Sequence, residues 1–174
     1  MASKLEYIKS QTSRDVATFD VEDIFSAEYD VYKIHLTKLE VSNDDYNWMR
    51  VINASGSADT SSNYVFGSLL TYAHTGFAEG ARSTGTTTWS YHNYAHPANY
   101  DDGAGSSIYI FNPFSSSDFT SMTYWSLGYS SSSNYLYGFK GIGIHKSAES
   151  ITGLQWGRTG TFQNVKVDVY GVAK

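Results

Sequence analysis

The sequence predicts an all-β protein, a jelly-roll-like antiparallel β-sandwich with a short N-terminal arm. In residues 29–41, Tyr32, Ile34 and Leu36 fall two apart and alternate with polar residues, as in a strand with one buried face. Valine alternates with polar residues in the same way over 165–170. Aromatic residues make up 16% of the chain, and Gly, Ser, Thr and Asn separate the apolar runs, which is typical of strands joined by turns.

Nine or ten short strands follow one another at intervals marked by turn residues. The expected strands are residues 16–21, 29–41, 46–53, 63–72, 86–91, 107–111, 119–129, 135–145, 151–156 and 161–172. Residues 76–85 are predicted to form a loop in which Phe77 is the apolar side chain that fills the space beneath it. Residues 92–105 are predicted to be the longest irregular stretch, and residues 157–160 a tight turn. Eight core strands plus extras fit a jelly roll better than an immunoglobulin domain, which is shorter and has fewer strands.

The apolar phase shifts within the first long strand, from Leu36 to Leu39 and Val41. One extra residue reverses the side-chain alternation of a strand. We therefore expect a β-bulge here, or a bend where the strand passes between two sheets.

Two units are expected, an arm over residues 1–15 and a sandwich domain over 16–174. The arm is polar apart from Leu5, Tyr7 and Ile8. Two interpretations remain open: a frayed terminus, or an anchoring arm that becomes ordered only against a partner chain. On the second interpretation, deleting residues 1–15 leaves the domain folded but prevents its attachment.

Composition excludes several classes of protein. The 174 residues include no Cys, which removes disulfides and thiol catalysis. The first residues contain no apolar stretch of the kind a secretion signal needs, and no long apolar run occurs, so we expect synthesis in a cytoplasm and no membrane partner. The net charge of -5 and the scattered basic residues argue against nucleic-acid binding.

Neither metal nor cofactor is expected. His92 and His96 lie four apart, but the following Pro97 indicates a loop, and a zinc site needs a third ligand on a rigid platform. The acidic pairs at 44–45 and 101–102 lack the ordered spacing of a calcium loop and read as turns.

Catalysis is not expected either. Glycoside hydrolysis needs two carboxylates facing one groove, yet the acids of residues 83–138 are Asp101, Asp102 and Asp118, all in predicted loops. No nucleophile elbow, glycine-rich phosphate loop or zinc-protease helix motif occurs. His35 and His145 are expected on the solvent-facing sides of strands. We therefore predict a protein that is not an enzyme.

Residues 83–138 are nearly uncharged and rich in aromatic side chains, which bury much area at low entropic cost. Three uses fit: filling the sandwich core, forming an interface between protomers, and stacking on sugar rings. The residues assigned to contact with a carbohydrate or a partner are Trp89, Tyr94, Tyr100 and Trp125. Those assigned to hydrogen bonds with sugar hydroxyls are Asn93, Asn99 and Asp101.

Five segments carry a family resemblance through their order and spacing: residues 19–36, 49–57, 109–114 (Tyr-Ile-Phe-Asn-Pro-Phe), 151–155 and 169–172. Taken together, they make the chain resemble the small virion structural proteins of tailed marine phages, including cyanophages. The resemblance implies a jelly-roll-like sandwich displayed on a phage particle, either as a capsid decoration protein or as a tail-fibre module. The resemblance implies no catalytic residues for this chain.

The expected function is therefore that of a virion structural protein, made in the host cytoplasm and attached through its arm and one sheet edge. Its expected partners are other capsid or tail proteins and further copies of itself, with a trimer as one candidate symmetry. The alternative is a carbohydrate-binding module of a tail fibre, whose partner is a host-surface glycan.

Overall fold

The structure is a computed structural model that describes residues 4–42, 47–73, 76–91, 96–97, 104–130 and 135–173. Over these residues the regular structure is entirely β, and none of them forms a helix capable of crossing a membrane. The strands are β1 (Leu5–Ser13), β2 (Val16–Val21), β3 (Val31–Val41), β4 (Asn47–Asn53), β5 (Tyr64–Tyr72), β6 (Gly76–Thr86), β7 (Trp89–Tyr91), β8 (His96–Pro97), β9 (Ala104–Phe111), β10 (Thr120–Ser130), β11 (Tyr135–His145) and β12 (Ile151–Val172).

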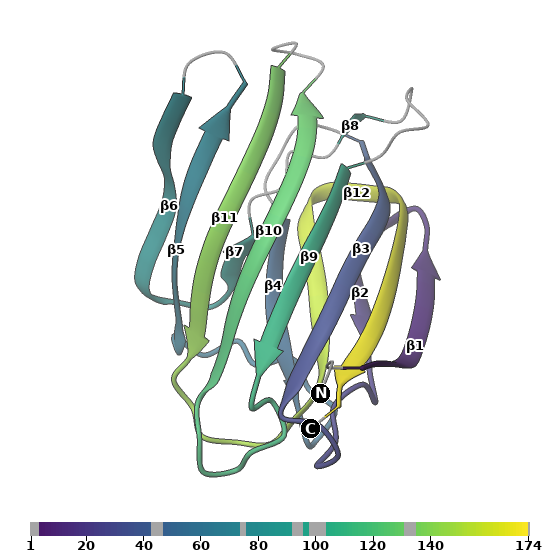
Figure 1. Ribbon diagram of the computed structural model, residues 1–174, viewed down its shortest axis with the longest axis vertical. Helices are drawn as coiled ribbons and strands as arrows, with labels where there is room; N and C mark the ends of the chain where they lie inside the picture. The colour runs from purple at the N-terminus through teal and green to yellow at the C-terminus, as the bar shows by residue number, and fades with distance from the viewer. Residues whose placement is uncertain are drawn as a thin grey trace.

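The strands form two layers, which confirms the predicted all-β, jelly-roll-like sandwich. One layer runs in the order β6-β5-β11-β10-β9-β3 and continues through the second part of β12 to β1. Behind it, β7 pairs with β4, and the first part of β12 pairs with β4 and β2 (Figure 1). All pairings of these strands are antiparallel except that of the two-residue β8 with β3.

The last strand, β12, joins the two layers. Its residues 151–158 pair with β2 and β4, and its residues 162–172 pair with β1 and β3, with one further pair between Phe162 and Val16 of β2. Gly160 has a φ of 103°, a value that favours glycine, at the point where the strand crosses over. The predicted tight turn at 157–160 is therefore wrong: the chain bends there from one layer into the other without reversing.

A bulge interrupts β3 where the apolar phase shifts. The register against β9 slips between Leu36 and Leu39, and Lys38 has a φ of 53°. Thr37 and Lys38 are both exposed, whereas Leu36 and Leu39 on either side of them are buried. The sequence-based expectation of a bulge is confirmed, because the extra residue restores the inward direction of the apolar side chains.

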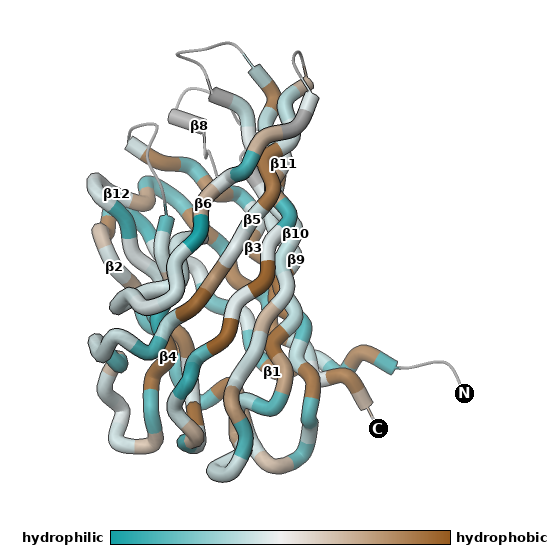
Figure 2. Tube along the Cα trace, turned by 90° about the vertical axis from the view of Figure 1, so that its left-hand side faces the viewer, coloured by the Kyte–Doolittle hydropathy of each residue, from teal (hydrophilic) through white to brown (hydrophobic). Residues whose placement is uncertain are grey.

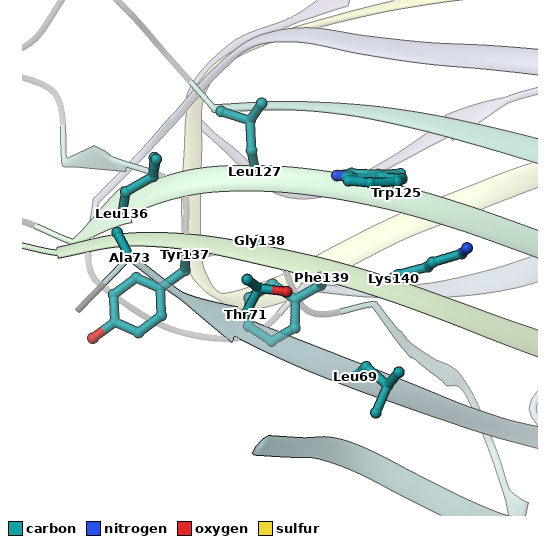
Figure 3. A pocket seen from close by; sticks show the side chains of 10 residues that line it. All are labelled: Leu69, Thr71, Ala73, Trp125, Leu127, Leu136, Tyr137, Gly138, Phe139 and Lys140. Carbon is teal, nitrogen blue, oxygen red and sulfur yellow. The ribbon is translucent and has the colours of Figure 1, made fainter. Parts of the chain in front are cut away.

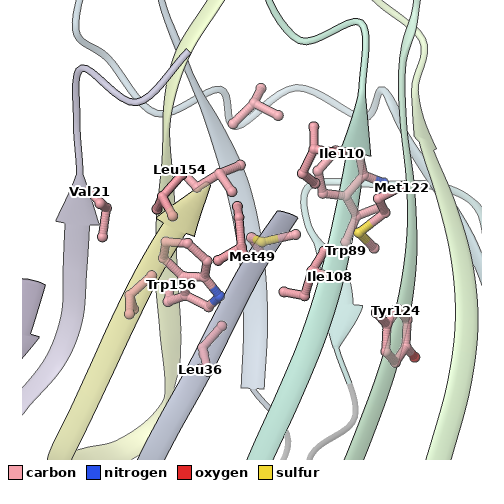
Figure 4. Close-up of a cluster of buried hydrophobic side chains, with 14 of the residues drawn as sticks. Val21, Leu36, Met49, Trp89, Ile108, Ile110, Met122, Tyr124, Leu154 and Trp156 are labelled. Carbon is pink, nitrogen blue, oxygen red and sulfur yellow. The ribbon is translucent and has the colours of Figure 1, made fainter. Parts of the chain in front are cut away.

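The core fills the space between the layers (Figure 4). Met49, Leu154 and Trp156 project from the smaller layer toward Ile108 and Met122 of the larger one. All five are buried, and Trp156 stacks on a neighbouring phenylalanine ring with centroids 5.4 Å apart. This packing supplies the main stabilisation of a chain without disulfides.

The N-terminal segment is an edge strand of the larger layer. β1 pairs antiparallel with β12 from Leu5 opposite Val172 to Ser13 opposite Val165, so the start of β1 and the end of β12 lie together (Figures 1 and 2). Ile8 is bulged out of this register and packs against the core. The segment is thus a paired strand and not a frayed terminus, because the edge of β12 offers it backbone hydrogen-bond partners.

Deleting residues 1–13 is therefore expected to destabilise the domain. Each backbone hydrogen bond lost with β1 contributes about 1 kcal/mol net, so the free energy of unfolding falls by several kcal/mol. Chemical denaturation of the full and shortened chains measures the difference. Equal stability of the two chains would show that β1 adds nothing to the fold.

β6 was predicted to be a loop, and that prediction is wrong. The strand lies at the other edge of the larger layer and pairs with β5 from Gly76 opposite Tyr72 to Thr86 opposite Tyr64, with two register shifts. Its residues are mostly small and polar and carry no apolar alternation. An edge strand that is held by backbone hydrogen bonds needs no apolar alternation, so the sequence pattern did not indicate a strand here.

Candidate functional site

Five large apolar side chains lie exposed on the outer face of β5, β10 and β11. They are Leu69, Trp125, Leu127, Leu136 and Ile142, and each is between 50% and 65% exposed. We call this set the apolar patch. Four of them, Leu69, Trp125, Leu127 and Leu136, border one space on this face, together with Lys140, which opposes Leu69 on one side and Trp125 on the other. A contiguous exposed apolar area of this kind marks an interaction surface in soluble proteins.

The local sequence of β10 explains how the patch arises. Met122 and Tyr124 point into the core, while Trp125 and Leu127 occupy the opposite phase of the same strand and point outward. A strand with one solvated face would place polar residues at those outward positions. β10 instead carries large apolar side chains on both faces.

The patch surrounds a hollow of about 390 Å³ (Figure 3). Figure 3 shows Leu127 and Trp125 on β10, Leu136 and Lys140 on β11 and Leu69 on β5. The Lys140 ammonium is the one charged group among the residues that line the hollow. Gly138 has no side chain, so the floor between Leu127 and the neighbouring Thr71 of β5 is low.

The two tryptophans predicted to contact a carbohydrate or a partner differ in their exposure to solvent. Trp125 is exposed within the patch, in agreement with an accessible position. Trp89 is wholly buried, and its indole Nε1 donates a hydrogen bond to the carbonyl oxygen of Ile144 at 3.2 Å. The prediction that Trp89 contacts a ligand is therefore wrong, because β7 turns it into the core.

The other predicted contact residues lie elsewhere. Tyr94, Tyr100, Asn93, Asn99 and Asp101 fall outside the described residues. The same holds for His92 and for the acidic pairs at 44–45 and 101–102, and nothing is described of the His96 side chain. Leu5 and Tyr7 of the predicted anchoring arm are exposed on β1, and Ile8 is partly buried.

His145 was predicted to face solvent, but it is fully buried, with its Nε2 2.6 Å from Asp59 Oδ2. One ligand atom each of Asp59, His145 and Glu149 lie within 4.8 Å of one another. The buried Nδ1 of His145 has no partner among the described residues. A hydrogen bond between His145 Nε2 and Asp59 Oδ2 accounts for their separation of 2.6 Å, so the closeness of these groups needs no bound ion to explain it.

The Asp59 carboxylate makes stability depend on pH. Burial alone would raise its pKa, but hydrogen bonds from the Ser61 side chain, the Ser61 amide and His145 hold the pKa below the ordinary 3.8. A depressed pKa contributes stability above the unfolded value that is lost as pH falls through the folded value.

Asp59→Asn is accordingly expected to lower the free energy of unfolding by about 1–3 kcal/mol at pH 7. The difference from the unmodified chain should shrink as the pH falls from 3.8 through the lower folded-state pKa, because the wild-type carboxylate becomes protonated over that range. Denaturant titrations from pH 7 down to acid measure it. A difference that stays constant over this range would contradict the role given to the Asp59 charge.

A second set of side chains crosses the same outer face beside the patch. Cross-strand register places Trp125 of β10 opposite Ser107 of β9, and it places Tyr109 of β9 opposite Lys33 of β3. Lys33 Nζ lies 5.6 Å from the centre of the Tyr109 ring. Two aromatic rings on adjacent strands therefore lie between two lysines, Lys140 on β11 and Lys33 on β3.

Sequence reasoning found only Trp125 of the apolar patch. The other four residues were predicted to lie in strands, but the sequence did not show whether their side chains point to the core or to solvent: Leu69, Leu127, Leu136 and Ile142. The sequence did contain an indication of an exposed apolar face, since β10 and β11 carry apolar residues at consecutive positions such as Leu136 and Tyr137. In an isolated sequence, however, this pattern is equally typical of a strand buried on both faces.

Comparisons with known proteins define no relative of this sandwich. No protein-family model and no curated protein matches the sequence. Among solved structures, an alginate lyase, Aly36B, in complex with an alginate trisaccharide gives a TM-score of 0.27 at 8% identity and covers 90% of this chain and 80% of its own. A human SPRY domain gives 0.24 at 7% identity, covering 92% and 96%. A CBM2 module of the evolved Dit protein of Lactobacillus casei BL23 phage J-1 gives 0.25 at 11% identity, covering 98% and 78%. These scores are too low to carry an argument about this chain.

Proposed function

We propose that this chain is a non-enzymatic structural protein of a phage particle, a capsid decoration or cement protein that attaches to a neighbouring protein subunit through the apolar patch. The observation that carries the proposal is the patch itself, whose five side chains are at least half exposed on a single domain. Covering them removes apolar surface from water, at roughly 25 cal/mol per Å² before ordering costs.

The chemistry of the patch favours a protein partner over a sugar. A bound sugar needs hydrogen-bond donors and acceptors around its hydroxyls, yet side chains with such groups are few around the hollow, chiefly Thr71 and Lys140. Apolar side chains dominate instead, and the fully buried centre of an assembled interface is likewise more apolar than the rest of a protein surface. The partner surface should therefore be apolar too.

Repeated contacts in a particle suit such a surface. One patch used many times around a symmetric shell gives many identical contacts, and an apolar patch also accepts a second copy of the same chain. The exposed β1 strand, with Leu5 and Tyr7 on its surface, offers a further contact at the sheet edge.

The experiment that tests this function is mass spectrometry of density-purified particles from the phage whose genome encodes the chain. A structural protein should be present in many copies per particle and remain through washing. Its absence from purified particles, with the chain found only in the host lysate, would contradict the proposal.

A second candidate function is that of a tail-fibre or receptor-binding carbohydrate module. It is favoured by one observation, the exposed Trp125 ring with the Lys140 ammonium 5.8 Å from its centre, beside Tyr109. An aromatic ring stacks on the C–H face of a sugar, while a nearby charged donor fixes its orientation.

A further inference from the structure

We propose that a band of side chains across the outer face of β11, β10, β9 and β3 is a binding site for an anionic glycan. This inference develops the second candidate function and requires neither a virion role nor a protein partner on the apolar patch. The band consists of Lys33, Ser107, Tyr109, Thr123, Trp125 and Lys140.

Register fixes the half of the band on β10 and β11. Trp125 stands directly opposite Lys140 on one side and opposite Ser107 on the other. Figure 3 shows Trp125 and Lys140 projecting from neighbouring strands. A hollow of about 410 Å³ lies here, lined by Trp125, Lys140, Ser107 and the nearby Tyr109 and Thr123. A flat ring, a hydroxyl and an ammonium group thus border one space.

The other half repeats this combination one strand further along. Thr123 opposes Tyr109, which in turn opposes Lys33. The Lys33 ammonium lies 5.6 Å from the Tyr109 ring centre, and the Lys140 ammonium lies 5.8 Å from that of Trp125. The two aromatic rings therefore each have a lysine beside them, with the Ser107 and Thr123 hydroxyls between.

The charge of this face is opposite to that of the chain. The protein has a net charge of -5, but β5, β9, β10 and β11 contain no acidic residue, and β3 contains only Glu40, beyond its bulge. The acid on the next strand, Asp168, is paired with Lys166 at 2.9 Å. Partial burial and Lys33 lower the pKa of His35, so this neighbour of Ser107 adds no full charge at neutral pH.

An anionic sugar chain fits these groups. Its ring faces present C–H groups to Trp125 and Tyr109, and its carboxylates or sulfates can form charge-assisted hydrogen bonds with Lys33 and Lys140. A neutral glycan would offer neither ammonium group an anion to pair with, so it would forgo both charge-assisted hydrogen bonds. A nucleic acid would need more cations than the two this band offers.

The test measures binding of purified chain to oligogalacturonate, to a heparin oligosaccharide and to a neutral cello-oligosaccharide by isothermal titration calorimetry. Binding to at least one acidic probe and none to the neutral probe is expected. Lys33→Gln and Lys140→Gln should each weaken it about tenfold, and Trp125→Ala should do the same, since each removes one favourable contact. Lys146→Gln, which changes an exposed lysine away from the band, should leave it unchanged.

The proposal would be overturned by the absence of binding to either acidic probe, by equal binding to the neutral probe, or by binding that survives both lysine substitutions. Equal affinity for single-stranded DNA would also overturn it, because the site would then be a general polyanion surface. Leu136→Gln, which lies in the patch but outside the band, should keep glycan binding, so failure of the patch and failure of the band are distinguishable.

Discussion

Trp89→Ala is expected to lower the free energy of unfolding by about 3–5 kcal/mol, the cost of removing a buried tryptophan. The indole is fully buried, meets the Tyr64 ring edge-on with centroids 5.2 Å apart and donates a hydrogen bond to Ile144. Its loss leaves a cavity and a carbonyl without that partner. In a thermal melt, a change of this size lowers Tm by roughly 6–20 °C in a domain of this length.

Trp125→Ala is the matched control for this prediction. Trp125 is the same residue type in the same fold, but 61% of it is exposed. Its removal should change the free energy of unfolding by less than about 1 kcal/mol. If Trp89→Ala were as mild as Trp125→Ala, the placement of Trp89 in the core would be wrong, and its earlier interpretation as a contact residue would return.

The double substitution Leu127→Glu and Leu136→Glu is expected to abolish attachment to the particle while the domain stays folded. Both side chains are about half exposed, so glutamates are tolerated in the free protein. Within an apolar interface the two carboxylates would be buried without partners, at several kcal/mol each. Co-sedimentation of the purified variant with particles measures attachment, and circular dichroism checks the fold.

Thr60→Glu with Ser116→Glu provides the control. It adds the same charge at exposed positions away from the apolar patch and should attach as the unmodified chain does. If the patch variant attached equally well, the partner would not cover the patch. If both variants failed, net charge would explain the loss, and the patch would have no special part in it.

Much of the fold follows from local patterns. The alternation in β3 and β12 predicted strands on the basis of side-chain period alone, and β11 was predicted with its observed bounds. The shift from Leu36 to Leu39 even located the bulge, because side-chain direction records the backbone register. These elements carry their own signal since one of their faces is buried.

The sequence pattern did not predict the two edge strands of the larger layer or the crossover of β12 between the layers. β1 and β6 are strands because neighbouring strands offer them hydrogen bonds, which is a property of the assembled sheet. At residues 157–160, glycines indicated a turn, and only the pairing of β12 with four other strands shows that the chain continues. Tertiary context decides such segments.

The candidate site was predictable only in part. Trp125 was singled out for its type and its uncharged surroundings, and the same argument wrongly selected Trp89. The two tryptophans differ in the direction of their side chains, which point to the core in one case and to solvent in the other. That direction depends on how each strand pairs in the sheet. Leu69 of β5 and Leu136 of β11 come together only through that pairing, so a sequence without the sheet register cannot join them into one patch.

Cryo-electron microscopy of the intact particle tests the central claim most directly, since it shows what covers the outer face of β5, β10 and β11. The account predicts density for many copies of the sandwich, each with Leu69, Leu136 and Ile142 buried against a neighbouring subunit. Copies whose apolar patch faces open solvent, attached through some other surface, would contradict it.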